Sequence, residues 1–483
     1  MQSSSNSNLV TLEVNAADAA TEIFLIDGRL RRIAKGVGWL GHDVAPGFYK
    51  LRYRSAATQV DELIEVTGET ERHAVHAEPI AFRSAAPLAY TATANVAQLN
   101  RAQEWSHMQG VPYCSLFLFL RQEDEERQIE PVEVQVLDLA GELIAGLNEG
   151  MWDEAARCAG LTRALPPGTY RVRVVNPVLG TYEMFVSLCD GWQTQVFLTP
   201  DVFERNNERV TAVSLRRSSI FMARTHEGFD PYNPNLRLGE LAKHAISQGR
   251  NVVSREVINS FLDEKFKNPM LGFAVAHLLM RRPKRNYELL DTVLCNLKCM
   301  TVDHPDLEAL ELGLRTSGYG RSFELSRPPM FLASWDFMVR ATRARASLIH
   351  PASVPGQIAH NVASSAPWLL HRLPDEPTQG PVRLSLRDSE ALFNNLLSIG
   401  ADELLARAKE MREGQSLSGL EQNILNLVLT HQKVMQIGET ARFEAETSPG
   451  EGKHGLSRAL RRIRAPAYSV ASAVQSLCDK MKG

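Results

Sequence analysis

Apolar and polar residues alternate along two stretches of this chain that share one short phrase. Residues 46–52 read PGFYKLR and residues 167–173 read PGTYRVR. Each phrase begins with a Pro-Gly turn, and the aromatic and aliphatic residues that follow alternate with Lys or Arg, which is the period of a strand with one buried face. The repetition predicts two copies of one β-module in the first half of the chain.

The first module is predicted to span residues 9–80, after a polar segment, 1–8, that we expect to be a disordered tail. Apolar runs of strand length, separated by Gly and Pro, cover 23–26, 48–53, 63–66 and 73–76. Short strands at this spacing predict a small antiparallel β-sandwich.

The second module is predicted to span 81–229, with a helical insertion near 92–108. Its strand-like segments follow the same order as those of the first copy and cover 114–120, 132–139, 167–175, 184–188 and 195–198. The turn residues Asp138 and Gly141 stand where the first copy has Asp27 and Gly28. The first 229 residues are therefore predicted to be a duplicated sandwich.

The hydrophobic period changes from two to about 3.6 beyond residue 230, which predicts helices. A helical-hairpin domain is expected over 230–317, with helices at 270–280, 287–300 and 306–314, and Asn268-Pro269 has the form of an N-cap followed by Pro at the first helical position. Residues 318–381 are predicted to be a Pro-rich irregular segment that contains a helix near 330–346. C-terminal helices are predicted over 382–438, and a linker with a basic amphipathic tail over 439–483. The predicted fold class is multidomain β + α: two tandem small antiparallel β-sandwich modules followed by a helical-hairpin or repeat-like α-helical region.

Composition narrows the class of protein. Apolar residues make up 44% of the 483 residues and charged residues 23%, which is ordinary for a globular protein, and a net charge of −3 carries no specific nucleic-acid signal. Six scattered cysteines indicate a reducing compartment, the N-terminus has no secretory pattern, and no apolar run approaches the roughly 20 residues of a membrane helix. We therefore expect a cytoplasmic protein without a transmembrane segment.

Several motifs that are typical of catalytic or binding sites occur without the neighbouring elements or residues that such sites need. Residues 36–41 (GVGWLG) match G-x-G-x-x-G, but a Pro-Gly turn and a strand follow where a nucleotide site needs a helix, so we interpret these glycines as turn residues. Cys295, Cys299 and His304 lack a fourth zinc ligand, and buried cysteines are the expected alternative. Residues 123–126 (EDEE) are expected to be a solvated hairpin loop. No cofactor and no metal are predicted.

Two basic clusters are candidate binding sites. Arg281, Arg282, Lys284 and Arg285 lie at a turn between helices, where they can dock an acidic partner or complement the dipole of the preceding helix. A second cluster lies in the tail, where 456–464 has the pattern of a short amphipathic helix that can dock a partner, pack on its own domain or contact a membrane surface. Its arginines are Arg458, Arg461, Arg462 and Arg464.

The Pro-Gly-x-Tyr phrase resembles the PEGA and carboxypeptidase-regulatory-like, or transthyretin-like, β-sandwich modules, although neither copy contains the literal Pro-Glu-Gly-Ala string. The resemblance implies non-catalytic binding or spacer domains. Residues 268–280 and 304–308 are similar to helical regions of uncharacterised bacterial proteins that are associated with peptidases in conflict systems. That similarity implies a bacterial defence or signalling setting.

These observations favour a non-enzymatic adaptor, scaffold or regulatory protein that acts through protein–protein interfaces, with a peptidase among the expected partners. One alternative is a substrate or gated effector of a partner peptidase, cut in an exposed linker such as 373–381 or 444–455. A second alternative is a Ser/His hydrolase that uses residues in 347–371, with His350, His360 and His371 near several serines. No nucleophile elbow or His-Glu-x-x-His pair accompanies these residues.

Overall fold

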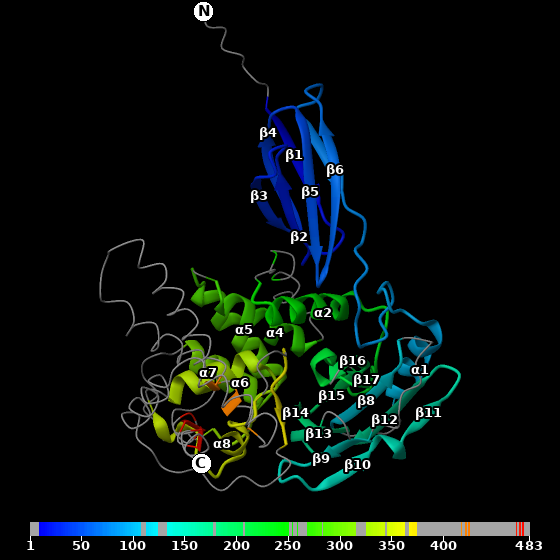
Figure 1. Cartoon of the computed structure of the whole chain (residues 1–483), viewed down its shortest axis with the longest axis vertical. Coiled ribbons are helices and arrows are strands. Elements are labelled where there is room, and N and C mark those ends of the chain that lie inside the picture. The colour runs from blue at the N-terminus through cyan, green and yellow to red at the C-terminus, as the bar shows by residue number, and fades with distance from the viewer. Residues whose placement is uncertain are drawn as a thin grey trace, which may run out of the picture. The chain divides into compact units, whose positions relative to one another are not determined.

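The structure is a computed structural model that describes residues 9–373 except for short gaps (Figure 1). The gaps are 108–112, 124–132, 177–179, 206–207, 251–253, 255–257, 259–267, 283, 315–324, 343–344 and 363–366; beyond 373 only 417, 421–422, 424–425, 470, 473–474 and 476–477 are described. The chain divides into two compact units. Unit 1 comprises 1–134, 145–168 and 187–310, and unit 2 comprises 135–144, 169–186 and 311–483.

The N-terminal module is one sheet of seven strands in the order β6-β5-β2-β3-β4-β1-β7. The strands are β1 (Val10–Asn15), β2 (Glu22–Ile26), β3 (Arg32–Val37), β4 (Trp39–Val44), β5 (Gly47–Ser55), β6 (Thr58–Val66) and β7 (Arg72–His76). Only the pair Val37 and Trp39 joins β3 to β4, so the sheet has two halves. Apolar side chains from both halves, among them Leu12, Ile23 and Leu51, share one buried core, as in a β-sandwich.

The second module repeats the strand neighbours of the first. Its strands are β8 (Ser115–Arg121), β9 (Glu133–Leu137), β10 (Leu143–Gly146), β11 (Met151–Asp153), β12 (Cys158–Ala164), β13 (Gly168–Asn176), β14 (Gly180–Leu188) and β15 (Trp192–Leu198). The order β14-β13-β9-β10 corresponds to β6-β5-β2-β3, and β12-β8-β15 corresponds to β4-β1-β7. The predicted fold class is confirmed, with one addition: β1 pairs with β7, and β8 with β15, in parallel.

The second module also receives strands from later in the chain. Strand β18 (Ser219–Arg224) pairs antiparallel with β15, and β19 (Leu370–Arg372) pairs antiparallel with β14. A separate hairpin consists of β16 (Pro200–Arg205) and β17 (Glu208–Val213). In the second copy, one strand is thus added beside β14 and another beside β15. The first copy has no matching strands among the described residues.

The repeat extends to the hydrogen bonds of one turn. Asp27 follows β2, and its Oδ1 accepts from the backbone N–H groups of Arg29 and Arg31 at 2.9 and 2.8 Å. Asp138 follows β9, and its Oδ1 accepts from Gly141 and Glu142 at 2.8 and 2.9 Å. An aspartate that bonds the backbone of its own turn holds the chain reversal after the same strand in both modules.

Of the three glycines in the G-x-G-x-x-G stretch, Gly38 lies in the turn between β3 and β4, whereas Gly36 belongs to β3 and Gly41 to β4, so the interpretation as turn residues is confirmed for Gly38 and wrong for the other two. Gly38 has φ +70°, a left-handed conformation that glycine adopts without a steric cost. A Cβ on Gly38 would lie 2.8 Å from the carbonyl oxygen of Ala19.

Substituting Gly38 with alanine is expected to lower the free energy of unfolding by about 2–3 kcal/mol, because both backbone strain and a backbone clash result. Gly249 is the matched control: it has φ +66°, and a Cβ there meets no atom within 4 Å. Gly249→Ala is therefore expected to cost only about 1 kcal/mol. Urea unfolding followed by tryptophan fluorescence measures both, and equal losses would contradict the role of the clash.

The described helices lie in the predicted helical regions except for Val354–Ile358, which falls in the Pro-rich segment where only a helix near 330–346 was predicted. They are α1 (Val96–Ser106), α2 (Pro234–Ser247), α4 (Pro269–Met280), α5 (Tyr287–Met300), α6 (Pro305–Leu314), α7 (Leu332–Thr342) and α8 (Val354–Ile358), with 3-10 turns η1 (Leu147–Glu149), η2 (Leu215–Arg217) and η3 (Ala346–Leu348). The predicted cap is confirmed, since Asn268 Oδ1 accepts from Met270 N at 3.1 Å. Most of 382–438 and 439–483 lies outside the described residues.

Helix α4 has an apolar sequence and every one of its residues is buried. It contacts α2, α5 and β18. None of the helices in the described part of the chain combines the length and the apolar character that crossing a bilayer requires.

Candidate functional site

An acidic residue of β6 is held between two basic residues of β5 in the N-terminal module. Asp61 Oδ2 lies 2.6 Å from Lys50 Nζ, and Arg52 donates to both carboxylate oxygens at 2.8 and 3.0 Å. Lys50 and Arg52 belong to the repeated phrase and project from the outer face of β5, while Leu51 and Tyr53 enter the core. We call these three residues the Asp61 clamp.

The second module contains the same arrangement. Arg171 and Arg173 occupy the positions of Lys50 and Arg52 in the repeated phrase. Both contact Glu183 on β14: Arg171 Nη1 lies 3.3 Å from Oε2, and Arg173 Nε donates to Oε1 at 2.7 Å. Glu183 is therefore the counterpart of Asp61, and we call this group the Glu183 clamp.

A third basic side chain, that of His371, completes the Glu183 clamp. Strand β19 pairs with β14 so that His371 faces Glu183, and the two side chains meet at 3.0 Å between Nε2 and Oε2. The ring of His371 also stacks on Phe185 at 5.3 Å between centroids. The added strand thus places a basic residue opposite the clamped acid, and the Glu183 side chain is 0% exposed.

The Asp61 clamp has no such covering strand among the described residues. Strand β6 stands at the end of its sheet, and the Asp61 side chain is 32% exposed. Neighbouring apolar side chains on the outer face are open as well, because Leu63 is 80% exposed and Phe48 is 69% exposed. An open strand edge beside exposed apolar side chains is a surface suited to another polypeptide.

The outward backbone groups of β6 follow from its hairpin. Ser55 pairs with Thr58 across the two-residue turn 56–57, and such a turn closes on a hydrogen-bonded pair. Hydrogen-bonded and non-hydrogen-bonded pairs alternate along antiparallel strands, so Asp61, Leu63 and Glu65 fall at non-hydrogen-bonded positions. Their N–H and C=O groups therefore point away from β5, toward the open edge.

Both clamps stabilise a carboxylate in its charged form. Hydrogen bonds from Arg52 and Lys50 lower the pKa of Asp61 to about 2. Burial by itself raises the pKa of Glu183, but the contacts with His371, Arg173 and Arg171 outweigh it and lower that pKa to about 2. Each clamp therefore holds a charged carboxylate on its strand, paired with two basic side chains of the neighbouring strand.

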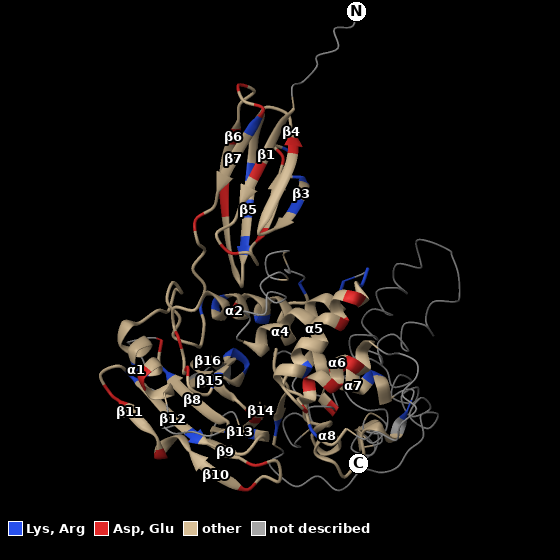
Figure 2. Cartoon of the chain, turned by 180° about the vertical axis from the view of Figure 1, so that it is seen from behind, with Lys and Arg blue, Asp and Glu red and all other residues tan. Residues whose placement is uncertain are grey.

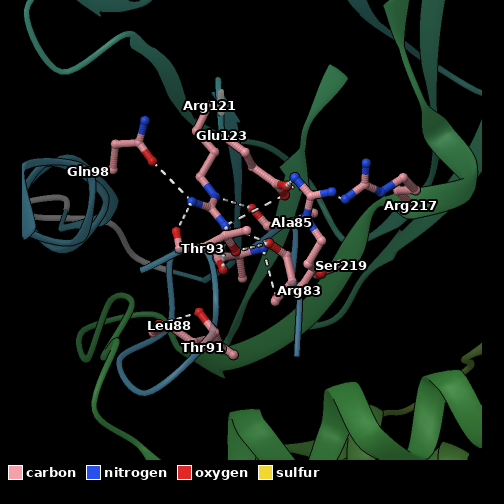
Figure 3. A network of polar contacts seen from close by, with 12 residues as sticks. Arg83, Ala85, Leu88, Thr91, Thr93, Gln98, Arg121, Glu123, Arg217 and Ser219 are labelled. Atoms are coloured by element: carbon pink, nitrogen blue, oxygen red, sulfur yellow. Dashed lines mark hydrogen bonds and ion pairs between the residues drawn. The ribbon is translucent and has the colours of Figure 1, made fainter. Parts of the chain in front are cut away.

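A third polar network is centred on Arg121, the last residue of β8, whose side chain is 0% exposed (Figure 3). Its Nε donates to Ala85 O at 2.8 Å, and Nη1 donates to Thr93 O and to Gln98 Oε1 at 2.7 and 3.0 Å. Nη2 donates to Ser84 O at 2.5 Å. Burial lowers the pKa of Arg121 to about 10, so the group stays charged while it ties residues 84–93 to β8.

The prediction that 123–126 is a solvated loop is wrong for Glu123, and 124–126 lies outside the described residues. The Glu123 side chain is only 5% exposed. It forms ion pairs with Arg83 at 3.3 Å and with Arg217 at 3.2 Å, beside Arg121 (Figure 3). The local acidic run gave no sign of this burial, because its partners lie in distant parts of the sequence.

The basic cluster after α4 is used in part to complete helix ends. Arg281 Nη1 donates to Ile246 O, in the last turn of α2, at 2.7 Å. Arg285 Nε donates to Met280 O, at the end of α4, at 3.0 Å. Both contacts follow the preference of helix C-termini for cations. Arg282 is half-buried and Lys284 is exposed, and binding by these four residues stays a prediction.

The other tail and linker predictions lie outside the described residues. These are the arginines Arg458, Arg461, Arg462 and Arg464, the segment 456–464, and the linkers 374–381 and 444–455.

The candidate metal ligands Cys295, Cys299 and His304 have different surroundings. Cys295 and Cys299 are exposed on α5, so the expectation of buried cysteines is wrong, while His304 is buried and stacks on Phe273 at 4.3 Å. Among the described residues, no three His, Cys, Asp or Glu side chains are placed to hold a metal ion.

The histidines of the Pro-rich segment have separate surroundings. His350 is exposed, and its Nδ1 accepts from Ala352 N at 3.1 Å. Burial lowers the pKa of His360. Ser353 caps α8 by accepting from Gly356 N, and its hydroxyl also donates to His350 O at 2.6 Å. Ser364 and Ser365 lie outside the described residues. Of the three histidines, His371 belongs to the Glu183 clamp.

No known protein family matches the chain, and no curated protein matches it. Among solved structures, the chain is similar to the Bacillus anthracis TIE protein, with 13% sequence identity and a TM-score of 0.15. The match covers 37% of this chain and 31% of that one, so it spans less than a third of the length of that protein. A likeness at this TM-score carries no argument about fold or function.

Proposed function

We propose that this chain is a non-enzymatic adaptor that acts through protein–protein interfaces and that its N-terminal module supplies one of them. The observation that carries the proposal is the difference between the two modules. The β14 edge is covered by β19 of the same chain, whereas β6 ends its sheet with Asp61, Leu63 and Phe48 exposed. Among the described residues, this edge of the module is covered in the second copy and open in the first.

The buried charges support an architectural role for the rest of the described chain. Glu22 and Glu183 are enclosed by basic side chains, Arg121 is enclosed by carbonyl oxygens, and Lys243 donates to Glu240 at 2.7 Å. Buried charged groups that contact internal partners hold a fold together and are poorly placed to bind or transform a substrate.

The wider setting rests on the sequence resemblances. The Pro-Gly-x-Tyr phrases favour PEGA-like or carboxypeptidase-regulatory-like modules, which mostly bind or space other domains. The helical resemblance favours a bacterial defence or signalling system in which a peptidase is the partner.

Site-specific photo-crosslinking in the cell that encodes the chain tests the proposal. A photoreactive residue in place of Leu63 is expected to give discrete crosslinked species that contain a second protein. Leu143 on β10 is the matched control, since it is also a leucine on the end strand of a sheet and is 60% exposed. Equal crosslinking at 63 and 143, or none at 63, would argue against an interface at this module.

A further inference from the structure

We infer that β6 accepts an extended basic segment of a partner protein as an added antiparallel strand, with a Lys or Arg side chain opposite Asp61. The inference rests on the proposed adaptor function and specifies its partner. Its template is the second module, where β19 already occupies the corresponding edge.

Strand β19 shows the direction in which an added strand runs and the kind of side chain that it places opposite the clamped acid. Strand β19 runs antiparallel to β14, with Glu183 opposite His371 and Tyr182 opposite Arg372. Leu373 N also donates to Thr181 O at 2.9 Å, so the ladder continues past the strand. In β19, backbone pairing is thus combined with a basic side chain against the clamped acid.

The Asp61 clamp leaves room for the same contact. Asp61 contacts two basic side chains where Glu183 contacts three, and about a third of the Asp61 side chain is open to solvent. A cation on an added strand opposite Asp61 would take the place that His371 takes beside Glu183. Opposite charges directly across two strands favour pairing.

Charge also selects a basic segment over a second copy of β6. The sequence of β6 (Thr58–Val66) contains Asp61, Glu62 and Glu65 and no Lys or Arg (Figure 2). Two antiparallel copies of β6 would bring these acids together, and like charges across strands are destabilising. A basic strand meets the acids with opposite charge.

Exposed apolar side chains on β6 indicate which residues the added strand needs besides its basic ones. Val60 is 45% exposed although it stands on the core side of β6, opposite Tyr53. A β-branched residue of the added strand beside Val60 would cover the Val60 side chain. Side chains on the outer face of the added strand would cover Leu63. The matching segment therefore alternates basic and β-branched residues, with its basic residues on the outer face.

Fluorescence anisotropy with the full-length protein tests this inference. The probe is a labelled, end-blocked octapeptide of alternating Lys and Val, and its control is the same peptide with Glu in place of Lys. The Lys peptide is expected to bind at least about ten-fold more tightly, Asp61→Asn is expected to weaken it about five-fold, and added salt is expected to weaken it further.

Two substitutions at one position separate backbone pairing from side-chain contact. Leu63→Pro removes an N–H that points outward, so it is expected to abolish binding and to leave the β5–β6 ladder intact, whereas Leu63→Thr keeps the N–H and is expected to retain most of the affinity. Circular dichroism confirms the fold of each variant. Equal binding by Leu63→Pro and Leu63→Thr would overturn strand addition.

Failure of this inference and failure of the adaptor function give different results. If residue 63 crosslinks a partner and neither peptide binds, the adaptor function stands and the basic added strand is wrong. If the full-length chain forms a dimer that Leu63→Pro dissociates, a second copy fills the edge and the basic partner is likewise wrong. A crosslinked partner at residue 63, together with binding of the Lys peptide that Leu63→Pro abolishes, supports both.

Discussion

Arg121→Met is expected to lower the free energy of unfolding by about 3–5 kcal/mol, because it removes every donor of a buried guanidinium at once. The guanidinium donates to Ser84 O, Ala85 O, Thr93 O and Gln98 Oε1 in a place that water does not reach. Methionine fills the space without donating, so backbone carbonyl groups remain buried without these bonds. Each buried polar group that loses its partner costs about 1–3 kcal/mol.

Arg121→Lys separates charge from geometry in the same network. A lysine keeps the positive charge, but one ammonium group cannot reproduce the planar set of donors that reaches several carbonyls at once. We expect a loss of about 2 kcal/mol, between the wild type and the methionine variant.

Arg163 on β12 provides the matched control for Arg121. It pairs with Glu149 at 2.8 Å, and both side chains are nearly half exposed. Arg163→Met is expected to change stability by less than about 1 kcal/mol, because exposed ion pairs contribute little. Urea unfolding followed by tryptophan fluorescence measures the series, and an Arg121→Met variant within about 1 kcal/mol of the wild type, on the same scale as exposed pairs, would show that the network is not needed.

Acidification from about pH 5 to pH 2 is expected to remove about 3 kcal/mol of stability for each of two buried carboxylates, Glu22 and Glu183. Burial by itself raises the pKa of Glu22, but hydrogen bonds from Arg54, Lys35 and Arg250 outweigh it and lower that pKa to about 2. The pKa of Glu183 is lowered to about 2 in the same manner. Both side chains are fully buried.

The direction of this effect follows from the two states. In the unfolded chain these carboxylates take up protons near their ordinary pKa of about 4.3, whereas in the folded chain they stay charged until the pH approaches 2. The unfolded state therefore binds more protons in this interval, and stability falls as the pH falls. Above about pH 5 the contribution is complete.

Glu22→Gln and Glu183→Gln are expected to be less stable at neutral pH and to show a flatter decline of unfolding midpoint between pH 5 and pH 2. Glu65→Gln, which alters an exposed carboxylate of β6, serves as the control and is expected to follow the wild-type profile. Identical profiles for all three variants and the wild type would assign the acid sensitivity to other groups.

Much of the fold could be predicted from short stretches of the sequence. The alternation in 46–52 and 167–173 predicted β5 and β13, and the Asn268 cap predicted the start of α4, because each depends on residues within a few positions of one another. The Asp61 clamp was also within reach of the sequence. Arg52 and Asp61 face each other across a hairpin whose register is set by its two-residue turn.

Partners far apart in the sequence were not predictable. Glu123 belongs to a run of acids that is typical of a solvated loop, yet Arg83 and Arg217 enclose it. Cys295 and Cys299 were expected inside because free cysteine is usually buried, but the exposed face of α5 is set by what α5 packs against. Composition alone does not say which face of an element is covered.

The sequence by itself determined that the chain begins with a duplicated β-module, because the period of two and the Pro-Gly turn are properties of consecutive residues. Only the tertiary structure decided that the two copies differ at one edge. The three-residue strand β19 lies far beyond β14 in the chain, and its pairing depends on backbone hydrogen bonds and on the contact between Glu183 and His371. No local pattern encodes such a contact, and the described part of the chain places no equivalent strand beside β6.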